Sequence, residues 1–170
     1  MVVLSKGKNM KKLVLILCLL LTNYANAETG YDPKANPEKD LKAALVSAEE
    51  KDKLVLVIFG ADWCPDCRSL NKKIAEPPLA KTIDDNFSVI HVDVGRWDNN
   101  IEFASRFGKP IEKGIPSIAI LDKDQGIYYV AQGGEFATAR NAKVNSLNDW
   151  FEALLKAIDN QELEKRPMSK

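Results

Sequence analysis

The stretch that most constrains the fold runs over residues 54–70 and reads LVLVIFGADWCPDCRSL. Its first six residues are apolar without alternation, a pattern typical of a strand that is covered on both faces. A short turn then leads into a helix that opens on Cys64-Pro65-Asp66-Cys67. The stretch therefore predicts a buried strand, a turn and a helix, with two cysteines at the point where the helix begins.

The spacing of the two cysteines indicates a chemistry. Cys64 and Cys67 are three residues apart, so they lie within one helical turn and their sulfur atoms can meet. A helix N-terminus gathers unpaired N–H groups and the positive end of the helix dipole, and both favour the thiolate form of Cys64. Because a thiolate beside a second thiol supports disulfide exchange, we predict Cys64 as the nucleophile and Cys67 as the resolving thiol.

The N-terminus has the pattern of an export signal. Two lysines precede an apolar run over residues 13–21, and Ala25-Asn26-Ala27 supplies a small-x-small cleavage pattern. An apolar run of this length is too short to span a bilayer. We therefore expect residues 1–27 to be a cleaved signal peptide. The mature protein is then periplasmic or otherwise exported, without stable insertion in a membrane.

Removal of this segment changes the charge and the cysteine count. It carries four lysines and no acidic residue, so the remaining chain has 20 basic and 24 acidic residues. That balance, without a basic patch, gives no reason to expect a nucleic acid as partner. Only Cys64 and Cys67 remain, and a bridge between them would close too short a loop to stabilise the fold much. With one histidine beside them, they also fall short of the four ligands of a zinc site.

The rest of the chain predicts helices and strands around the central strand at 54–60. Helices are expected over residues 37–51, 64–75, 79–86 and 100–107. Further strands are expected over residues 87–94, 117–121 and 127–132. A last helix is expected after an N-cap at Ser146. Residues 28–36 are predicted to be a flexible lead-in and residues 161–170 a loose polar tail, which leaves one domain over residues 37–160.

Two motifs of this chain are similar to those of a known family. The run ADWCPDC that ends at Cys67 resembles the W-C-x-x-C active site of the thioredoxin superfamily, which follows a central strand. The run Gly114-Ile115-Pro116-Ser117 resembles that family's cis-proline loop ahead of an apolar strand. The resemblance covers most of the chain after the export signal. It implies an α/β thioredoxin-like fold, with a central mixed β-sheet flanked by helices on both faces, and thiol–disulfide oxidoreductase activity.

The same resemblance implies roles for residues around the cysteines. Trp63 is expected to flank the exposed sulfur and to contact substrate, with plain packing as the alternative. Pro116 is expected to be cis and to hold Ile115 so that its backbone pairs with an extended substrate segment beside Cys64. No metal and no cofactor are expected beyond the redox-active Cys64–Cys67 disulfide. The implied partners are protein disulfides or dithiols and, for an exported reductant, a membrane electron donor.

Pro65 and Asp66 lie between the cysteines and are expected to tune them. Proline fixes φ and suits the first turn of a helix. Asp66 places a negative charge near the thiolate and opposes the helix dipole, which favours a reductant over an oxidant. An acid in the first turn also stabilises a helix by itself, so Asp66 has a purely structural interpretation as well.

Two positions depart from the thioredoxin pattern. Many thioredoxins bury an acid six residues before the first cysteine, and this chain has Ile58 there. His91, its only histidine, stands where the following strand is expected to carry a lysine. We therefore consider His91 as the proton acceptor for Cys67, because an imidazole pKa near neutrality suits that role. A histidine that is simply packed or solvated on the sheet is the alternative.

Several functions stay open at this point. The segments 95–98 and 133–145 are longer than a minimal thioredoxin needs, and they either form a partner-docking rim or are loops without function. The first functional interpretation is a reductant of protein disulfides. The second is an oxidase or isomerase that donates its disulfide. The third is a copper-handling protein that uses Cys64, Cys67 and His91.

Overall fold

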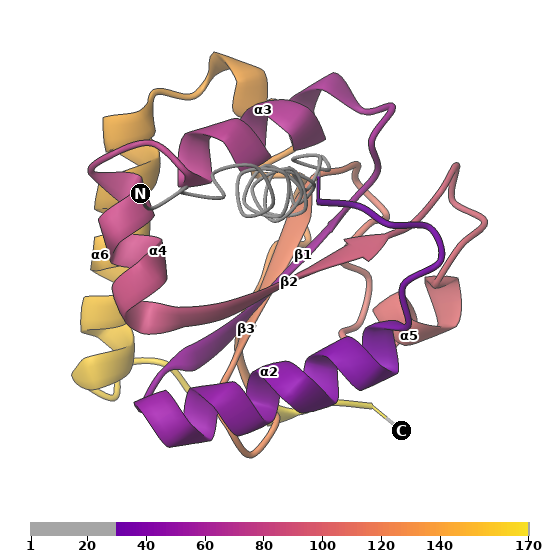
Figure 1. The fold of residues 1–170 in the computed structure, drawn as a ribbon. Coiled ribbons are helices and arrows are strands. Elements are labelled where there is room, and N and C mark those ends of the chain that lie inside the picture. Colours follow the sequence, from indigo (N-terminus) through magenta and orange to yellow (C-terminus); the bar gives the residue numbers. More distant parts are fainter. Residues whose placement is uncertain (1–29, 170) are drawn as a thin grey trace, which may run out of the picture.

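The computed structural model describes residues 30–169, so the expected signal peptide at 1–27 lies outside the described residues. Within that range, no helix has the length and the apolar character needed to cross a bilayer. With the labels of Figure 1, the elements follow in the order α2 (Pro37–Lys51), β1 (Leu54–Gly60), α3 (Pro65–Ile74), α4 (Leu79–Asn86), β2 (Phe87–Asp93), α5 (Ile101–Ser105), β3 (Ser117–Leu121), β4 (Gly126–Val130), the 3-10 turn η1 (Ala139–Asn141), α6 (Val144–Asp159) and β5 (Arg166–Pro167).

The strands of residues 30–169 form one mixed sheet in the order β2-β1-β3-β4-β5. β1 and β2 run parallel, and β3, β4 and β5 follow in antiparallel pairs. The central position of β1 explains its unbroken apolar sequence, because its residues from Val55 to Gly60 are buried by neighbours on both faces. The sheet therefore presents the carboxyl end of a fully buried strand to the turn that carries the cysteines.

Helices cover both faces of this sheet (Figure 1). α2 lies on one face, and α3, α4 and α6 lie on the other. Aromatic rings fill the space beneath them: Phe87 of β2 meets Phe151 of α6 at a ring distance of 5.7 Å, and Phe59 of β1 meets Phe107 at 5.3 Å. The predicted α/β architecture is confirmed.

The last helix begins before its predicted start. Its N-cap is Lys143 rather than Ser146, and no side chain caps it. Val144 packs against the core together with Leu147 and Phe151, which extends the apolar stripe of α6 toward the N-terminus. Burial of that stripe outweighs the capping preference of Ser146, which is worth only about 1 kcal/mol.

The predicted loose tail is held to the sheet. Arg166 and Pro167 form β5 beside β4, and the Arg166 guanidinium donates to the backbone carbonyl of Phe107 at 2.6 Å. Lys165 pairs with the carboxylate of Asp122 at 2.6 Å. The prediction of a loose tail is therefore wrong for residues 165–169, because polar side chains that look solvated in the sequence find partners far away in the chain.

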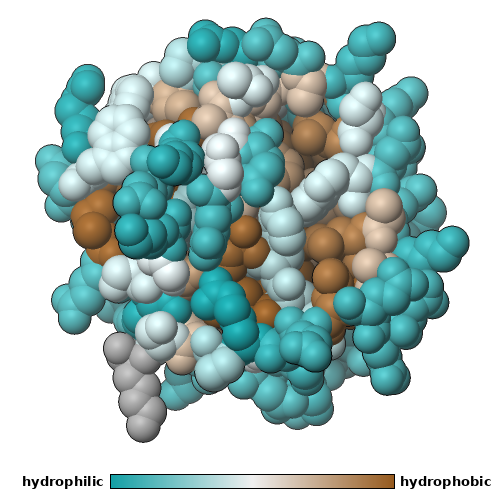
Figure 2. All heavy atoms as spheres, turned by 180° about the vertical axis from the view of Figure 1, so that it is seen from behind, coloured by the Kyte–Doolittle hydropathy of each residue, from teal (hydrophilic) through white to brown (hydrophobic). Residues whose placement is uncertain are grey.

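The surface is mostly hydrophilic on the face that Figure 2 shows, and its apolar residues form separate patches. Among the described residues, the large apolar side chains that stay exposed are Val46, Trp63, Trp97 and Ile101. Isolated exposed apolar residues are normal in soluble proteins. Trp63 and Trp97 are different because their rings contact each other beside the cysteines.

Candidate active site

The predicted cysteine pair lies at the N-terminus of α3. Cys64 is the N-cap of this helix, and its Sγ accepts a hydrogen bond from the backbone N–H of Cys67 at 3.2 Å. Both residues are free thiols. Cys64 is 4% exposed and Cys67 is fully buried, so Cys64 is the thiol nearer to solvent. That order of access suits a nucleophile followed by a resolving thiol.

The loop around Pro116 lies against Cys64. The Cys64 thiol donates to the backbone carbonyl of Ile115 at 3.5 Å. The Ile115–Pro116 peptide bond is cis, and Gly114 has a φ of +121°, a conformation that favours glycine. Two motifs that are far apart in the sequence thus meet at one sulfur atom. The backbone carbonyl of Ile115 therefore lies directly beside the Cys64 sulfur.

The environment of Cys67 opposes its ionisation. Burial raises the pKa of the Cys67 thiol well above its ordinary value, and the hydrogen bond with Cys64 and the negative charges of Cys64 and Asp66 raise it further. A hydrogen bond with the backbone of Ala61 acts in the opposite direction. Cys67 is therefore a thiol at neutral pH, and its attack on a disulfide requires stabilisation of its thiolate.

Asp66 is buried, whereas a first-turn acid is ordinarily solvated. Its carboxylate accepts a hydrogen bond from the backbone N–H of Arg140 at 3.0 Å, and the Arg140 guanidinium lies 3.4 Å away. From the same helix, the Lys73 ammonium donates to the carbonyls of Ala139 and Arg140 at 3.0 and 3.1 Å. Asp66 and Lys73 thus fix η1, within the segment 133–145, to the active-site helix. The sequence did not indicate this contact.

An exposed aromatic group borders the cysteines, and we call Trp63, Arg96 and Trp97 the tryptophan rim. The indole N–H of Trp63 donates to the carbonyl of Gly95 at 2.8 Å. The rings of Trp63 and Trp97 are 5.5 Å apart, and the Arg96 guanidinium lies 5.1 Å from the Trp63 ring. Trp63 is 39% exposed and Trp97 is 51% exposed. The rim is therefore fixed in place and yet open to a partner.

The loop that carries the rim is held in one conformation. Trp97 has a φ of +64°, in the left-handed region that bulky residues rarely adopt. The Asp93 carboxylate accepts hydrogen bonds from the backbone N–H of Gly95 at 2.9 Å and from the Asn99 amide at 3.1 Å. An uncommon backbone conformation that exposes an aromatic ring is a frequent mark of a functional surface.

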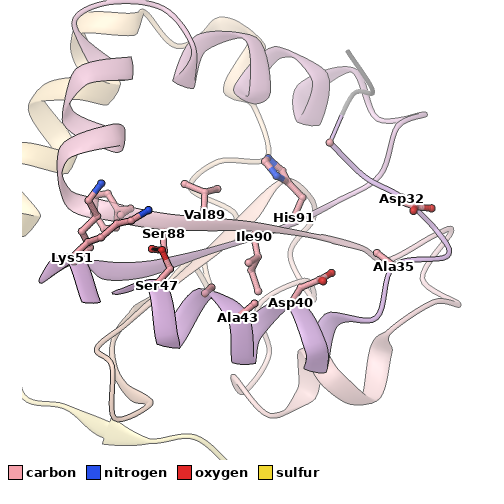
Figure 3. Close-up of a pocket in the computed structure, with 14 residues that line it drawn as sticks. Asp32, Ala35, Asp40, Ala43, Ser47, Lys51, Ser88, Val89, Ile90 and His91 are labelled. Atoms are coloured by element: carbon pink, nitrogen blue, oxygen red, sulfur yellow. Dashed lines mark hydrogen bonds between the residues drawn. The ribbon is translucent and has the colours of Figure 1, made fainter. Parts of the chain in front are cut away.

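His91 lies on the face of the sheet that α3 covers. Figure 3 shows His91 and Val89 leaving β2 on the side opposite to Ile90, which points toward α2. The Nε2 atom of His91 is 3.1 Å from the amide oxygen of Asn71 on α3. Burial lowers the pKa of His91 to about 4, against the opposing effect of the Asp62 charge. The expectation of a pKa near neutrality is therefore wrong, because partial burial under α3 disfavours the charged imidazolium.

Tyr31 occupies the floor of the site, and the sequence did not indicate it. It is 2% exposed, its ring stands edge-on to His91 at 5.2 Å, and its hydroxyl is 3.5 Å from the amide oxygen of Asn71. Gly60 makes room for it, because a Cβ atom there would lie 2.5 Å from the hydroxyl. The prediction of a flexible lead-in over 28–36 is therefore wrong at Tyr31. An aromatic residue within a polar segment was the available signal.

Two further features bear on the alternatives. A groove of about 540 Å³ lies between α2 and β2, lined by Ala43, Ser47 and Ile90 among others, and no cysteine lines it (Figure 3). Within residues 30–169, no group of three or more His, Cys, Asp or Glu side chains is arranged to hold a metal ion. The copper-handling alternative thus gains no support from the arrangement of these side chains.

Known proteins share this fold. Residues 36–123 match a family model described as thioredoxin-like. The chain is 33% identical to a disulfide isomerase from Xylella fastidiosa Temecula1, with a TM-score of 0.73 over 76% of this chain and 99% of that chain. The oxidised C-terminal domain of DsbD from Neisseria meningitidis is 20% identical, with a TM-score of 0.52 over 70% of this chain and 96% of that chain. At that identity, it supports the fold alone.

Curated relatives match part of the chain. The Thioredoxin-like protein HCF164, chloroplastic, of Arabidopsis thaliana is 26% identical over 141 residues, which are 65% of this chain and 52% of that protein. Its namesake in Oryza sativa subsp. japonica is 34% identical over 89 residues, 51% of this chain and 32% of that protein. The chain thus spans about half the length of these relatives or less. Since the family model matches more than half of the chain and the fold agrees with it, this chain belongs to the thioredoxin-like family.

Proposed function

We propose that this protein is an exported thiol–disulfide oxidoreductase that reduces disulfides in other proteins. The observation that carries the proposal is the position of Cys64. Its sulfur lies at the N-terminus of α3, bonded to the N–H of Cys67 on one side and to the carbonyl of Ile115 on the other. A sulfur so placed has a second thiol in reach and a backbone edge beside it.

The reaction follows from these neighbours. The Cys64 thiolate attacks one sulfur of a substrate disulfide, which forms a mixed disulfide and releases the other substrate sulfur as a thiolate. Cys67 then loses its proton and attacks the Cys64 sulfur. This step forms the Cys64–Cys67 disulfide and releases the second substrate thiolate. Two electrons have passed from the dithiol of the protein to the substrate.

The direction of exchange is proposed from the surroundings of Cys67. Burial and the Asp66 charge disfavour a thiolate there, and a poorly stabilised thiolate makes the dithiol a better electron donor. Pro65, the first residue of α3, fixes the backbone between the two thiols. An exported reductant has to be reduced again after each turnover. We therefore include a membrane-bound electron donor as partner and the periplasm or another exported location as the site of action.

Substrate contact is assigned to the surfaces around Cys64. The Ile115–Pro116 backbone would pair with an extended protein segment, and the tryptophan rim would cover the apolar side chains next to the substrate cysteine. The signal peptide at 1–27 and a mature thioredoxin-like domain that ends near residue 160 belong to the same proposal. β5 extends that domain to Pro167.

A disulfide-donating isomerase is the second candidate, because the Xylella fastidiosa protein that is 33% identical to this chain is a disulfide isomerase. The reduction potential of the Cys64–Cys67 pair separates the two. Thioredoxin has a potential of about −270 mV, and the strong oxidant DsbA has about −120 mV. A value near that of thioredoxin is expected, and a value near that of DsbA would overturn the proposed direction.

The activity itself is tested by reduction of insulin. The chain from residue 28 onward, kept reduced by dithiothreitol, should accelerate insulin precipitation. Cys64→Ser should remove the acceleration, because no other thiol in that chain is placed to attack first. Equal acceleration by Cys64→Ser and the unchanged chain would contradict the proposal.

A further inference from the structure

A partly buried polar cluster lies under α3, and the reaction described above does not use it. Tyr31, Asn71 and His91 come from three separate parts of the chain and meet under α3. Burial of polar groups is unfavourable unless they are hydrogen-bonded to one another. Asn71 follows Cys67 by four residues on α3, so the two side chains lie on one face of that helix.

Two adjacent residues at the end of β1 contact the groups in question. Gly60 contacts the Tyr31 hydroxyl, and the backbone of Ala61 contacts the Cys67 sulfur. The hydroxyl packs on Gly60, so closely that a Cβ atom there would overlap with it at 2.5 Å. The Cys67 sulfur is hydrogen-bonded to the backbone of Ala61, the next residue. Both groups are buried, Tyr31 at 2% and Cys67 at 0% exposure. Both groups thus lie against the end of β1, and the charge of Cys67 acts on the Tyr31 hydroxyl.

The hydrogen bonds allow this hydroxyl to turn. The amide oxygen of Asn71 is an acceptor only, so His91, which is neutral, donates its Nε2–H to it. That bond is 3.1 Å long, whereas the Tyr31 hydroxyl is 3.5 Å from the same oxygen. That oxygen can accept both hydrogen bonds, and the one from the hydroxyl is the longer, so its loss costs little when the hydroxyl turns toward a new acceptor.

The charged and titratable groups around the cluster keep Tyr31 a donor. Burial raises the pKa of Tyr31 well above its ordinary value, and the charges of Cys67, Cys64 and Asp62 raise it further. Asp66 adds its charge at Cys67, and His91 is neutral. The Tyr31 hydroxyl therefore keeps its proton and can donate a hydrogen bond to a Cys67 thiolate.

We propose that the Tyr31 hydroxyl donates a hydrogen bond to the Cys67 thiolate as this cysteine attacks the mixed disulfide, and that Asn71 and His91 position the hydroxyl for it. In this step Cys67 gives its proton to the substrate thiolate released by the first attack, its sulfur bonds to that of Cys64, and the second substrate sulfur leaves as a thiolate. Tyr31 keeps its own proton throughout. The inference rests on the proposed disulfide exchange and assigns the support of its second half to a residue outside the CxxC motif.

The test uses dithiobisnitrobenzoate, a symmetric aromatic disulfide whose two thiolates absorb light on release. The reduced chain should release the first thiolate when Cys64 attacks and the second when Cys67 resolves the mixed disulfide, so stopped-flow absorbance separates the two steps. Tyr31→Phe removes the hydroxyl and keeps the ring. We expect the second release to slow about tenfold at pH 7, because a hydrogen bond to a charged group is lost, with the first release changed less than about twofold.

The pH profile separates this role from a structural one. The pH at which the second release reaches half of its maximal rate should rise by about one unit in Tyr31→Phe. In strong base the rates of the variant and of the unchanged chain should become equal. Tyr129→Phe, on β4, is the matched control and should change neither release. His91→Gln keeps an N–H donor for Asn71, so its second release should slow less than that of Tyr31→Phe.

Three outcomes would overturn the inference. Equal second releases in Tyr31→Phe and the unchanged chain would remove the role of the hydroxyl. Equal slowing of both releases would indicate general damage to the fold. A larger slowing in His91→Gln than in Tyr31→Phe would return the role to His91. Absence of any second release from the unchanged chain would instead contradict the proposed function itself.

Discussion

On the outer side of the cysteine pair, the rings of Trp63 and Trp97 are exposed and touch each other, and Arg96 stacks on one of them. On the inner side, the buried Tyr31 and the partly buried Asn71 are hydrogen-bonded to each other. Each side includes a residue near the cysteines in sequence, Trp63 just before Cys64 and Asn71 four residues after Cys67. They differ in whether water, and therefore a partner protein, can reach them.

This difference separates two tasks. A group on the outer side can contact a substrate before and after the chemical step, so it acts mainly on binding. A group on the inner side never meets the substrate, so it acts only through Cys67 and the fold. Changes on the two sides should therefore alter different kinetic constants, and the following predictions test that separation from the largest expected effect to the smallest.

Removal of the resolving thiol should have the largest effect. Cys67→Ala leaves Cys64 and the rim intact, so the first attack should proceed and the mixed disulfide should persist. Turnover in the insulin assay should fall by at least about a thousandfold. Non-reducing gel electrophoresis and mass spectrometry should detect the trapped adduct. Unimpaired turnover would show that the inner side has no part in resolution.

Filling the space above Tyr31 should cost stability on the inner side. Gly60→Ala places a methyl group 2.5 Å from the Tyr31 hydroxyl, and overpacking of a buried site costs about 2 kcal/mol. Urea unfolding of both chains measures the difference. Gly133→Ala is the matched control, since its Cβ would lie no closer than 3.4 Å to other atoms and should cost less than about 0.5 kcal/mol. Equal stability of the two variants would contradict the close packing of Tyr31 on Gly60.

Acid should weaken the same region through His91. Its pKa is lowered to about 4 in the folded protein, so between pH 6.5 and 4 the unfolded chain binds a proton that the folded chain does not. The stability contributed by neutral His91 is full above pH 6.5 and is lost as the pH falls toward 4. From about pH 7 to about pH 5 this term should lower the free energy of unfolding by about 2 kcal/mol.

Urea titrations at both pH values, on the unchanged chain and on His91→Gln, isolate this term. The variant should lack that part of the pH dependence while keeping the part due to carboxylates. An identical slope in both chains would mean that His91 is as accessible to protons in the folded protein as in the unfolded one.

The smallest effect is expected on the outer side. Trp97→Ala should raise KM for a protein substrate about fivefold and leave kcat unchanged, because one exposed aromatic contact is lost and the thiols are untouched. Val46→Ala, an equally exposed apolar residue on α2, should change neither constant. A fall in kcat for Trp97→Ala would show that the outer side also acts on the chemical step, which contradicts the separation of the two tasks.

The sequence predicted the outer side better than the inner one. The positions of Trp63, Cys64 and Cys67 follow from one continuous motif, and the contact with Ile115 followed from a second motif that resembles the family's proline loop. His91 was placed correctly on the strand that follows β1, and the structure adds that its partner in the parallel register is Ile58. The pKa of His91 was not predicted correctly, because the degree of its burial depends on the side chains that α3 and the N-terminal segment contribute.

The sequence by itself determined the central strand, the helix that opens on the cysteines and the α/β order of the chain. These are local features, since continuous apolar runs, cysteine spacing and helix periodicity act over a few neighbouring residues. Only the tertiary structure decided that Tyr31 is buried, that Asp66 binds Arg140 and that the polar tail adds a strand. Those contacts join residues far apart in the chain, and their free energy depends on desolvation and geometry that no local pattern encodes.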